Sequence, residues 1–295
     1  MDAALFGELA INGALIGLMY ALAALGIVLI YKTSGVANLA QGALAMVAGY
    51  LAWAGYALLG IPIWLAAVLA LAAMFLIGYQ IERLALRHLV GQPAIMIVML
   101  TLGLEILFRG IVPGMFGAAV KRLDLGIDQA PIFLGPMLVN RAYFFGGATA
   151  ALLVGLAILF FNSRQGIVLR AVSDDQVAAW SVGIRVEQSI GLAWGIAGLA
   201  GAATGILWGS VQGVDWTLSL LLVKALAVAI LGGLDSVPGV LLAGVIVGVG
   251  ENVVPGMLDP VFGGGTRDVV ASVIILLTVF VRPHGLFGRE HIERV

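Results

Sequence analysis

Few charged or amide side chains interrupt the long apolar stretches of this 295-residue chain, and these are the first candidates for chemistry. Glu105 and Arg109 are four residues apart, which places both side chains on one face of a helix. The pair can be a structural ion pair that fixes helix packing, or it can take part in gating or substrate contact. Lys224 has no acidic residue within one helical turn, so we expect it to pair with Glu251 or Glu105 from another helix or to reach a polar boundary.

Asn38 and Gln41 are three residues apart and also share one helical face. Neutral amides can bind the polar groups of a small zwitterion, which would suit amino acids or amides as ligands. The same side chains also bridge neighbouring helices as ordinary packing groups. From the sequence both roles remain open, and we include Asn38 and Gln41 with Lys224, Glu105 and Arg109 as candidates for lining a transport pathway.

The sequence lacks the residues that metal binding, nucleophilic catalysis and ATP binding require. The chain has no cysteine, and its three histidines, His88, His284 and His291, do not suggest a shared ligand set, so we predict no metal site. No G-x-S-x-G elbow or other nucleophile–base arrangement is present, so we predict no catalytic residue. None of the three lysines follows a phosphate-binding glycine loop; Lys32 precedes Thr33 but follows Tyr31. We therefore expect no cofactor in this chain, and any ATP would be bound by another chain.

The elements that must position these residues are membrane-spanning helices. Hydrophobic residues make up 62% of the chain and charged residues 11%, which excludes a soluble globular domain. Crossing a bilayer takes about 20 apolar residues in a helix. We predict an all-α polytopic membrane protein with about eight or nine spanning helices, some of them half-helices or re-entrant segments. Clear spans are expected at 9–31, 36–59, 61–80, 93–112, 142–161 and 189–208, and segments shorter than a comfortable span at 218–231, 239–254 and 269–281.

The spacing of the glycines and one break between apolar segments predict further features of the helices. Glycines four residues apart, at 13 and 17, 191 and 195, 201, 205 and 209, and 244 and 248, predict flat helix faces for close packing. We expect a glycine-rich helix to end at Glu251 and Asn252, just before Pro255. The string LGGLDSVPG at 231–239 predicts a turn, or alternatively a discontinuous helix that lines a cavity.

Basic residues predict the orientation, because arginine and lysine are disfavoured in translocated loops. With the N-terminus outside and the C-terminus inside, nine basic residues face the cytoplasm and four face outward. Residues 164–187 then form the largest internal loop and residues 113–141 the largest external one. The inner set is Lys32, Arg83, Arg87, Arg164, Arg170, Arg185, Arg282, Arg289 and Arg294; the outer set is Lys121, Arg122, Arg141 and Arg267.

The internal segment 163–187 is the longest polar and amphipathic passage of the chain. A short amphipathic helix is expected there, with Asp174 or Asp175 as an N-cap and Gly183 as a terminator. Such a helix can dock a soluble partner or lie on the membrane surface. The predicted apolar stripe consists of Ile167, Val168, Ala171, Val172, Ala178, Ala179 and Val182.

Three motifs resemble one family in that family's order. SRQGIVLRAVSDDQVAAWSVGI, from Ser163, resembles the cytoplasmic coupling segment of permease subunits of ATP-binding cassette importers for branched-chain amino acids, a family that also serves amides and urea. Residues 17–50, beginning GLMYALAALG, resemble the N-terminal signature of that family, and residues 224–252, beginning KALAVAILGG, resemble its C-terminal one. The closing RPHGLFGR at 282–289 also fits.

This resemblance implies one permease domain over residues 1–295, in a bacterial inner membrane, that supplies half of a translocation pathway. It implies a second similar permease chain, two cytoplasmic ATPase subunits that bind ATP and Mg²⁺, and an extracytoplasmic solute-binding protein. No nucleic acid is expected as a partner. Residues 163–187 would be the coupling segment, with Arg164, Gly166, Arg170, Ala171, Asp174, Asp175, Ala179 and Gly183 as its framework.

Two other functions compete with this interpretation. An ion-coupled secondary transporter would use inverted repeats and midplane carboxylates, but no internal repeat is evident and Glu105 already has Arg109 beside it. An intramembrane enzyme would need the nucleophile or ligand cluster that is missing from the sequence. We therefore expect a permease subunit, not an enzyme. The substrate would be branched-chain or other amino acids, with amides or urea as further possibilities.

Overall fold

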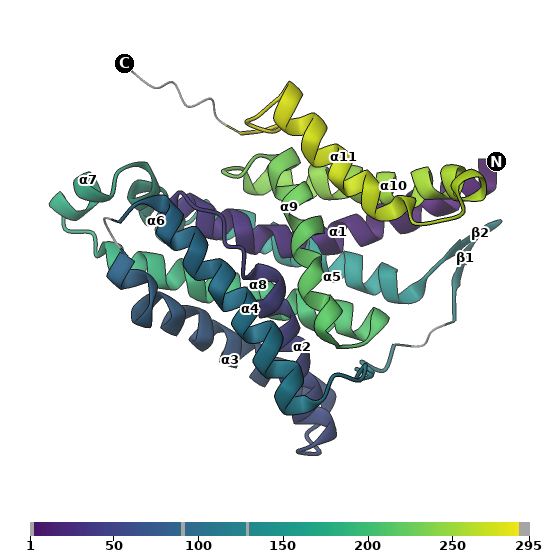
Figure 1. The fold of residues 1–295 in the computed structure, drawn as a ribbon, viewed down its shortest axis with the longest axis horizontal. Helices are drawn as coiled ribbons and strands as arrows, with labels where there is room; N and C mark the ends of the chain where they lie inside the picture. Colours follow the sequence, from purple (N-terminus) through teal and green to yellow (C-terminus); the bar gives the residue numbers. More distant parts are fainter. Residues whose placement is uncertain (1–2, 90–91, 128–129, 289–295) are drawn as a thin grey trace.

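The computed structural model describes residues 3–89, 92–127 and 130–288 (Figure 1). Over these ranges the chain forms eleven α-helices, two short 3₁₀ helices and one β-hairpin, which confirms the all-α prediction apart from the hairpin. The elements are α1 (Ala3–Ser34), α2 (Gln41–Ala57), α3 (Ile63–Leu84), η1 (Leu86–Leu89), α4 (Ala94–Phe116), β1 (Ile132–Leu134), β2 (Met137–Val139), α5 (Arg141–Phe161), α6 (Arg164–Asp174), α7 (Gln176–Ser181), α8 (Val186–Gln212), η2 (Trp216–Leu220), α9 (Leu221–Gly232), α10 (Val237–Phe262) and α11 (Thr266–Val281).

Within the described ranges, six helices are long and apolar enough to cross a membrane: α1, α3, α4, α5, α8 and α10. The segment Trp216–Gly232 is a shorter apolar helix, and α11 has 16 residues, as expected for the two shorter predicted spans. The prediction for 36–59 was too long, because residues 36–40 form a turn and α2 has only 17 residues. The chain is a multi-pass helical membrane protein.

The first helix forms the centre of the bundle. Residues 19–30 of α1 are buried without a break, which fits a helix that is apolar on every side. It packs against α5, α8, α9 and α10, and Figure 1 shows it passing between the other helices. The apolar residues on the outer helices α3 and α4 remain exposed on much of their surface, as expected for surfaces that face lipid or a partner chain.

Glycines bring α1 and α10 into backbone contact. A Cβ atom added at Gly17 would lie 2.1 Å from the carbonyl oxygen of Gly244, and one at Gly248 would lie 2.2 Å from that of Gly13. On α8, a Cβ at Gly205 would lie 1.8 Å from the carbonyl oxygen of Ala45 on α2. These contacts confirm the predicted close packing, since any larger residue would force the helices apart.

Two predictions about α10 were wrong. We expected 239–254 to be a short segment and its helix to end at Glu251 and Asn252, but α10 has 26 residues and continues through Pro255 and Pro260 to Phe262. Each proline removes only one helical hydrogen bond, and such a loss is tolerated in packed membrane helices. The helix ends at Gly263, whose φ of 83° reverses the chain. Glu251 therefore lies inside a long helix and not at its end.

The break at 231–239 is a turn between α9 and α10. Gly233 has a φ of 97°, and the Ser236 side chain caps α10 by accepting a hydrogen bond from Gly239 N at 3.1 Å. The segment after α11 covers this turn: Leu286 N donates to Leu231 O at 2.8 Å. A backbone amide from the closing motif thereby satisfies a carbonyl at the end of α9.

The two ends of the bundle differ in their loops (Figure 1). One end carries the N-terminus, the α10–α11 turn and the hairpin, in which Ile132 pairs with Val139. Asn12 on α1 fixes this hairpin, donating to Leu138 O at 2.8 Å and accepting from Asn140 N at 3.0 Å. The opposite end carries α6 and α7. Arg289 and Arg294, predicted to be cytoplasmic, lie outside the described residues.

Candidate functional site

The segment predicted to couple to a partner forms two helices with a sharp break between them. The Asp175 carboxylate accepts hydrogen bonds from Val177 N at 2.8 Å and Ala178 N at 2.9 Å. Asp175 is therefore the N-cap of α7, one of the two positions that we predicted. After α7, Gly183 turns the chain with a φ of 86°, and α8 begins at Val186.

Burial along α6 and α7 shows which face meets the membrane bundle. Gly166, Leu169, Val172 and Ala179 are buried, and a Cβ at Gly166 would lie 2.4 Å from Phe161, so only glycine fits there. The predicted apolar stripe does not form one continuous face, because the break at Asp175 separates α6 from α7 and no single helical period spans both. Val172 and Ala179 are buried, Val168 and Ala171 are partly buried, and Ile167, Ala178 and Val182 are exposed. Arg164, Asp174, Asp175 and Gly183 are exposed, while Arg170 and Ala171 are partly buried.

Large apolar side chains project from the other side of α7. Val177, Trp180 and Val182 are each about three-quarters exposed, at 75%, 74% and 75%. Val177 and Trp180 also line an open groove of about 530 Å³ whose opposite wall is formed by residues 183–188. Neither Val177 nor Trp180 was among the predicted residues, although a tryptophan beside polar residues was a usable signal. A mainly apolar groove of this kind is suited to receive a partner helix or loop.

A charged cluster ties the end of this segment to the rest of the chain. Arg87 on η1 lies 3.7 Å from Glu82 on α3 and 3.4 Å from Glu187 in the first turn of α8. Glu82 is buried, with 2% of its side chain exposed, whereas Glu187 is largely exposed. Arg87 thus connects a buried carboxylate to Glu187, which lies in the wall of the α7–α8 groove.

The candidate pathway residues fall in three separate places. Arg109 Nη1 lies 3.3 Å from Glu105 Oε1 on α4, which confirms that the two side chains meet on one helix. Asn38 and Gln41 are buried beside α8: Asn38 donates to Gln41 Oε1 at 3.2 Å, and Gln41 donates to Ala197 O at 3.1 Å. These bonds favour the packing role for the two amides, because their hydrogen-bonding groups serve helix contacts within this chain.

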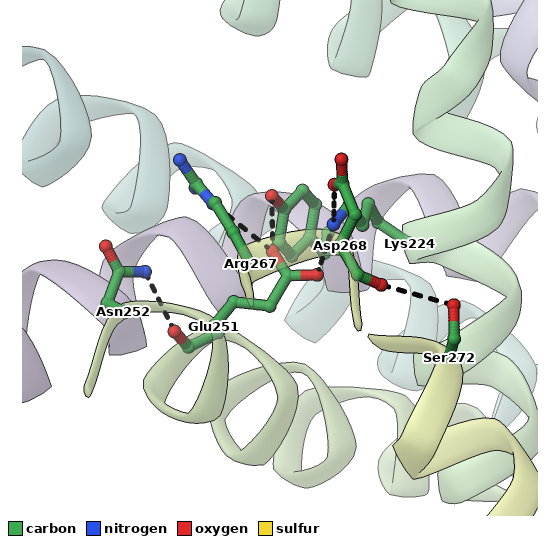
Figure 2. A network of polar contacts seen from close by, with 8 residues as sticks. Lys224, Glu251, Asn252, Arg267, Asp268 and Ser272 are labelled. Atoms are coloured by element: carbon green, nitrogen blue, oxygen red, sulfur yellow. Dashed lines mark hydrogen bonds and ion pairs between the residues drawn. The ribbon is translucent and has the colours of Figure 1, made fainter. Parts of the chain in front are cut away.

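Lys224 is part of a network that joins four helices, α1, α9, α10 and α11 (Figure 2). Its ammonium lies 2.7 Å from Glu251 Oε1 on α10, at ion-pair distance although the angles do not form a hydrogen bond. It also donates a hydrogen bond to Asp268 Oδ1 on α11 at 2.8 Å. The expected partner Glu251 is thereby confirmed.

Two further groups contact the second carboxylate oxygen of Glu251. Tyr20 on α1 donates to Glu251 Oε2 at 3.0 Å, and Arg267 Nε lies 3.6 Å from the same atom. Sequence reasoning missed Tyr20, Arg267 and Asp268 as members of this network. Arg267 and Asp268 stand directly before the last apolar run, which was a usable signal. Their positions relative to α9 and α10 depend on the tertiary fold.

Comparisons with known proteins agree on one family. A family model described as the permease component of a branched-chain amino acid transport system matches residues 9–281. The high-affinity branched-chain amino acid transport system permease protein BraD of Pseudomonas aeruginosa is 29% identical over 302 residues, which cover 97% of this chain and 96% of that protein. The probable branched-chain amino acid transport permease protein LivH of Methanocaldococcus jannaschii is 31% identical, covering 90% of this chain and 88% of that protein.

A third relative and one solved structure complete the comparison. The high-affinity branched-chain amino acid transport system permease protein LivH of Escherichia coli is 27% identical and covers 96% of both chains. Among solved structures, PsaBC from Streptococcus pneumoniae in complex with Fab aligns with 96% of this chain and 94% of that chain, at 14% identity and a TM-score of 0.49.

Proposed function

For this chain, which belongs to the permease-component family of branched-chain amino acid transport systems, we propose the role of one of two membrane subunits in an ATP-binding cassette importer. The chain is a multi-pass membrane permease subunit of an importer and not a catalytic enzyme. Its substrates would be branched-chain amino acids, the compounds named in the descriptions of its relatives. Amides and urea are further candidates, suggested only by the wider range of the family.

The observation that carries this function is the α6–α7 pair. Two helices project from one end of a membrane bundle and expose Val177, Trp180 and Val182 beside an open groove. Apolar side chains of this size, exposed outside the spans, are suited to bury against a soluble protein. The chain carries no phosphate-binding loop, so that protein would supply ATP hydrolysis.

The same role implies the remaining subunits of the importer. Two ATPase subunits would bind ATP and Mg²⁺ at the α6–α7 end, one on this chain and one on a second permease chain. An extracytoplasmic solute-binding protein would deliver the substrate to the hairpin end. This arrangement puts the N-terminus outside and the C-terminus in the cytoplasm. The excess of basic residues predicted for the inner side, including Arg87 and Arg164, supports this orientation.

The rival function, an ion-coupled transporter, receives less support from the charged residues. Such a carrier would need a carboxylate that is free to bind and release an ion near the middle of the membrane. Glu105 is 3.3 Å from Arg109 and Glu251 is 2.7 Å from Lys224, so each carboxylate has a cationic partner within this chain.

Labelling of an introduced cysteine tests both the orientation and the docking surface. The chain has no cysteine, so Val182→Cys would be its single reactive thiol. We expect a membrane-impermeant maleimide to label it in inside-out vesicles and not in intact cells. Bound ATPase subunits should slow that reaction by roughly tenfold or more, because an interface core excludes water.

Ala119→Cys is the matched control, since Ala119 is exposed in the segment between α4 and the hairpin at the opposite end. It should react in intact cells, and the ATPase subunits should not change its rate. Labelling of the Val182 position from outside the cell would contradict the orientation. An unchanged rate after the ATPase subunits bind would contradict the docking surface.

A further inference from the structure

The network around Lys224 is more than a buried ion pair, because its charges range from fully enclosed to open. None of the Glu251 side chain is exposed, whereas 14% of Lys224 and 89% of Asp268 are exposed. Lys224 therefore lies between a buried carboxylate and an open one (Figure 2). Asp268 belongs to the first turn of α11, directly after the α10–α11 turn at the hairpin end of the bundle.

We propose that Lys224 and Asp268 form a binding site for the α-carboxylate and α-ammonium groups of a free amino acid. The inference rests on the proposed function, because it names the residues of the importer that would read the substrate. It adds Asp268, which was not among the predicted pathway residues, and it assigns to Lys224 contact with the substrate carboxylate.

The chemistry is an exchange of partners. In the structure the Lys224 ammonium donates a hydrogen bond to the Asp268 carboxylate at 2.8 Å. An amino acid carries an ammonium and a carboxylate on the same carbon, so its carboxylate can replace Asp268 at Lys224 while its ammonium binds Asp268. The four charged side chains, Lys224, Arg267, Glu251 and Asp268, sum to zero before and after this exchange. No unpaired charge is left in a region of low dielectric constant.

The buried carboxylate of Glu251 would hold Lys224 in place during this exchange. Glu251 lies 2.7 Å from Lys224, so the lysine would keep one counterion if Asp268 turned away. Tyr20 and Arg267 in turn hold the second oxygen of Glu251, at 3.0 and 3.6 Å. A binding group that is held by neighbours in this way does not have to be ordered again when the ligand arrives.

Apolar surface lies beside the ion pair for the rest of the substrate. Leu220 precedes Lys224 by about one turn and is 47% exposed, and Val223 is 45% exposed. An aliphatic side chain would cover these residues while its charged groups bind Lys224 and Asp268. The site therefore matches an amino acid with an aliphatic side chain better than a small neutral amide.

The test uses the complete importer in proteoliposomes, with the double variant K224Q/D268N. Removing both charges leaves Arg267 and Glu251 as a balanced pair, so we expect the thermal unfolding temperature to stay within about 3 °C of that of the parent. ATP hydrolysis should still be stimulated by the loaded solute-binding protein. Uptake of radiolabelled L-leucine should fall by roughly 30-fold or more, because the double variant lacks both charges that would bind the substrate.

The matched control is D259N, which removes a carboxylate from the same turn, where Asp259 accepts hydrogen bonds from Thr266. It should leave leucine uptake within about twofold of the parent. Equal uptake by K224Q/D268N and the parent would overturn the site and leave the importer function intact. Loss of stimulated ATP hydrolysis together with uptake would also overturn it, because the pair would then serve the assembly instead of the substrate. Absence of leucine uptake by the parent importer would contradict the proposed function itself.

Discussion

At the scale of single residues, the most consequential charge away from the Lys224 network is the Glu82 carboxylate. It is buried at the end of α3, and Arg87 lies 3.7 Å away as its counterion. The same guanidinium reaches Glu187 at 3.4 Å, so one arginine connects α3 to the first turn of α8. The contact to Glu82 matters more for stability, because an exposed ion pair such as that with Glu187 contributes little.

Replacing Arg87 by alanine should therefore destabilise the chain. R87A would leave the Glu82 carboxylate buried without this partner, at a cost of about 2–3 kcal/mol in the free energy of unfolding. Denaturant titration of the detergent-solubilised chain measures this difference. The double variant E82Q/R87A should recover most of the loss, since no buried charge remains.

Arg83 provides the control for that prediction. It is exposed one residue after Glu82, and R83A should change the free energy of unfolding by about 0.5 kcal/mol or less. If R87A were no more destabilising than R83A, Arg87 would not be the stabilising partner of Glu82.

The residues of the candidate site were predictable to different degrees. Glu105 and Arg109 share a helix, so their spacing alone predicts the contact. Lys224 required a distant partner, and Glu251 was one of two acidic residues available in the apolar segments. Asp268 could not be found this way, because its approach to Lys224 depends on how α11 packs against α9.

At the scale of elements, glycine determines how closely the central helix meets its neighbours. Gly13 and Gly17 on α1 face Gly244 and Gly248 on α10, so the two backbones touch. The four-residue spacing predicted these faces correctly because small residues recur once per turn. Helix lengths were less predictable. Pro255 suggested that α10 ends there, but the packed helix continues through it. The apolar run 36–59 gave no sign of the turn that precedes α2.

Adding one methyl group at this contact should be costly. In G17A the new Cβ would lie 2.1 Å from the Gly244 carbonyl oxygen, so α1 and α10 must separate. We expect a loss of about 1–3 kcal/mol in the free energy of unfolding, measured by denaturant titration in detergent. G155A on α5, where a Cβ would meet no atom within 4 Å, should be neutral or slightly stabilising. Equal effects of the two substitutions would show that the α1–α10 contact does not limit packing.

At the scale of the whole molecule, the chain is a multi-pass membrane permease whose two ends carry different features. A membrane bundle carries an exposed pair of helices at one end and an open ion pair, Lys224 with Asp268, at the other. Composition and motif order predicted the membrane class and the family. They could not predict the exposed face of α7, because that face depends on the break at Asp175, nor Asp268 as a residue that would contact the substrate.

We propose that this chain carries amino acids across a membrane with energy from ATP hydrolysed by its partners. The most direct test is uptake of radiolabelled L-leucine into proteoliposomes that contain this chain, its second permease chain and the ATPase subunits, with the solute-binding protein outside and ATP inside. We predict accumulation against a gradient that requires every component and stops without ATP. Accumulation driven by a proton or sodium gradient in the absence of ATP would contradict the account.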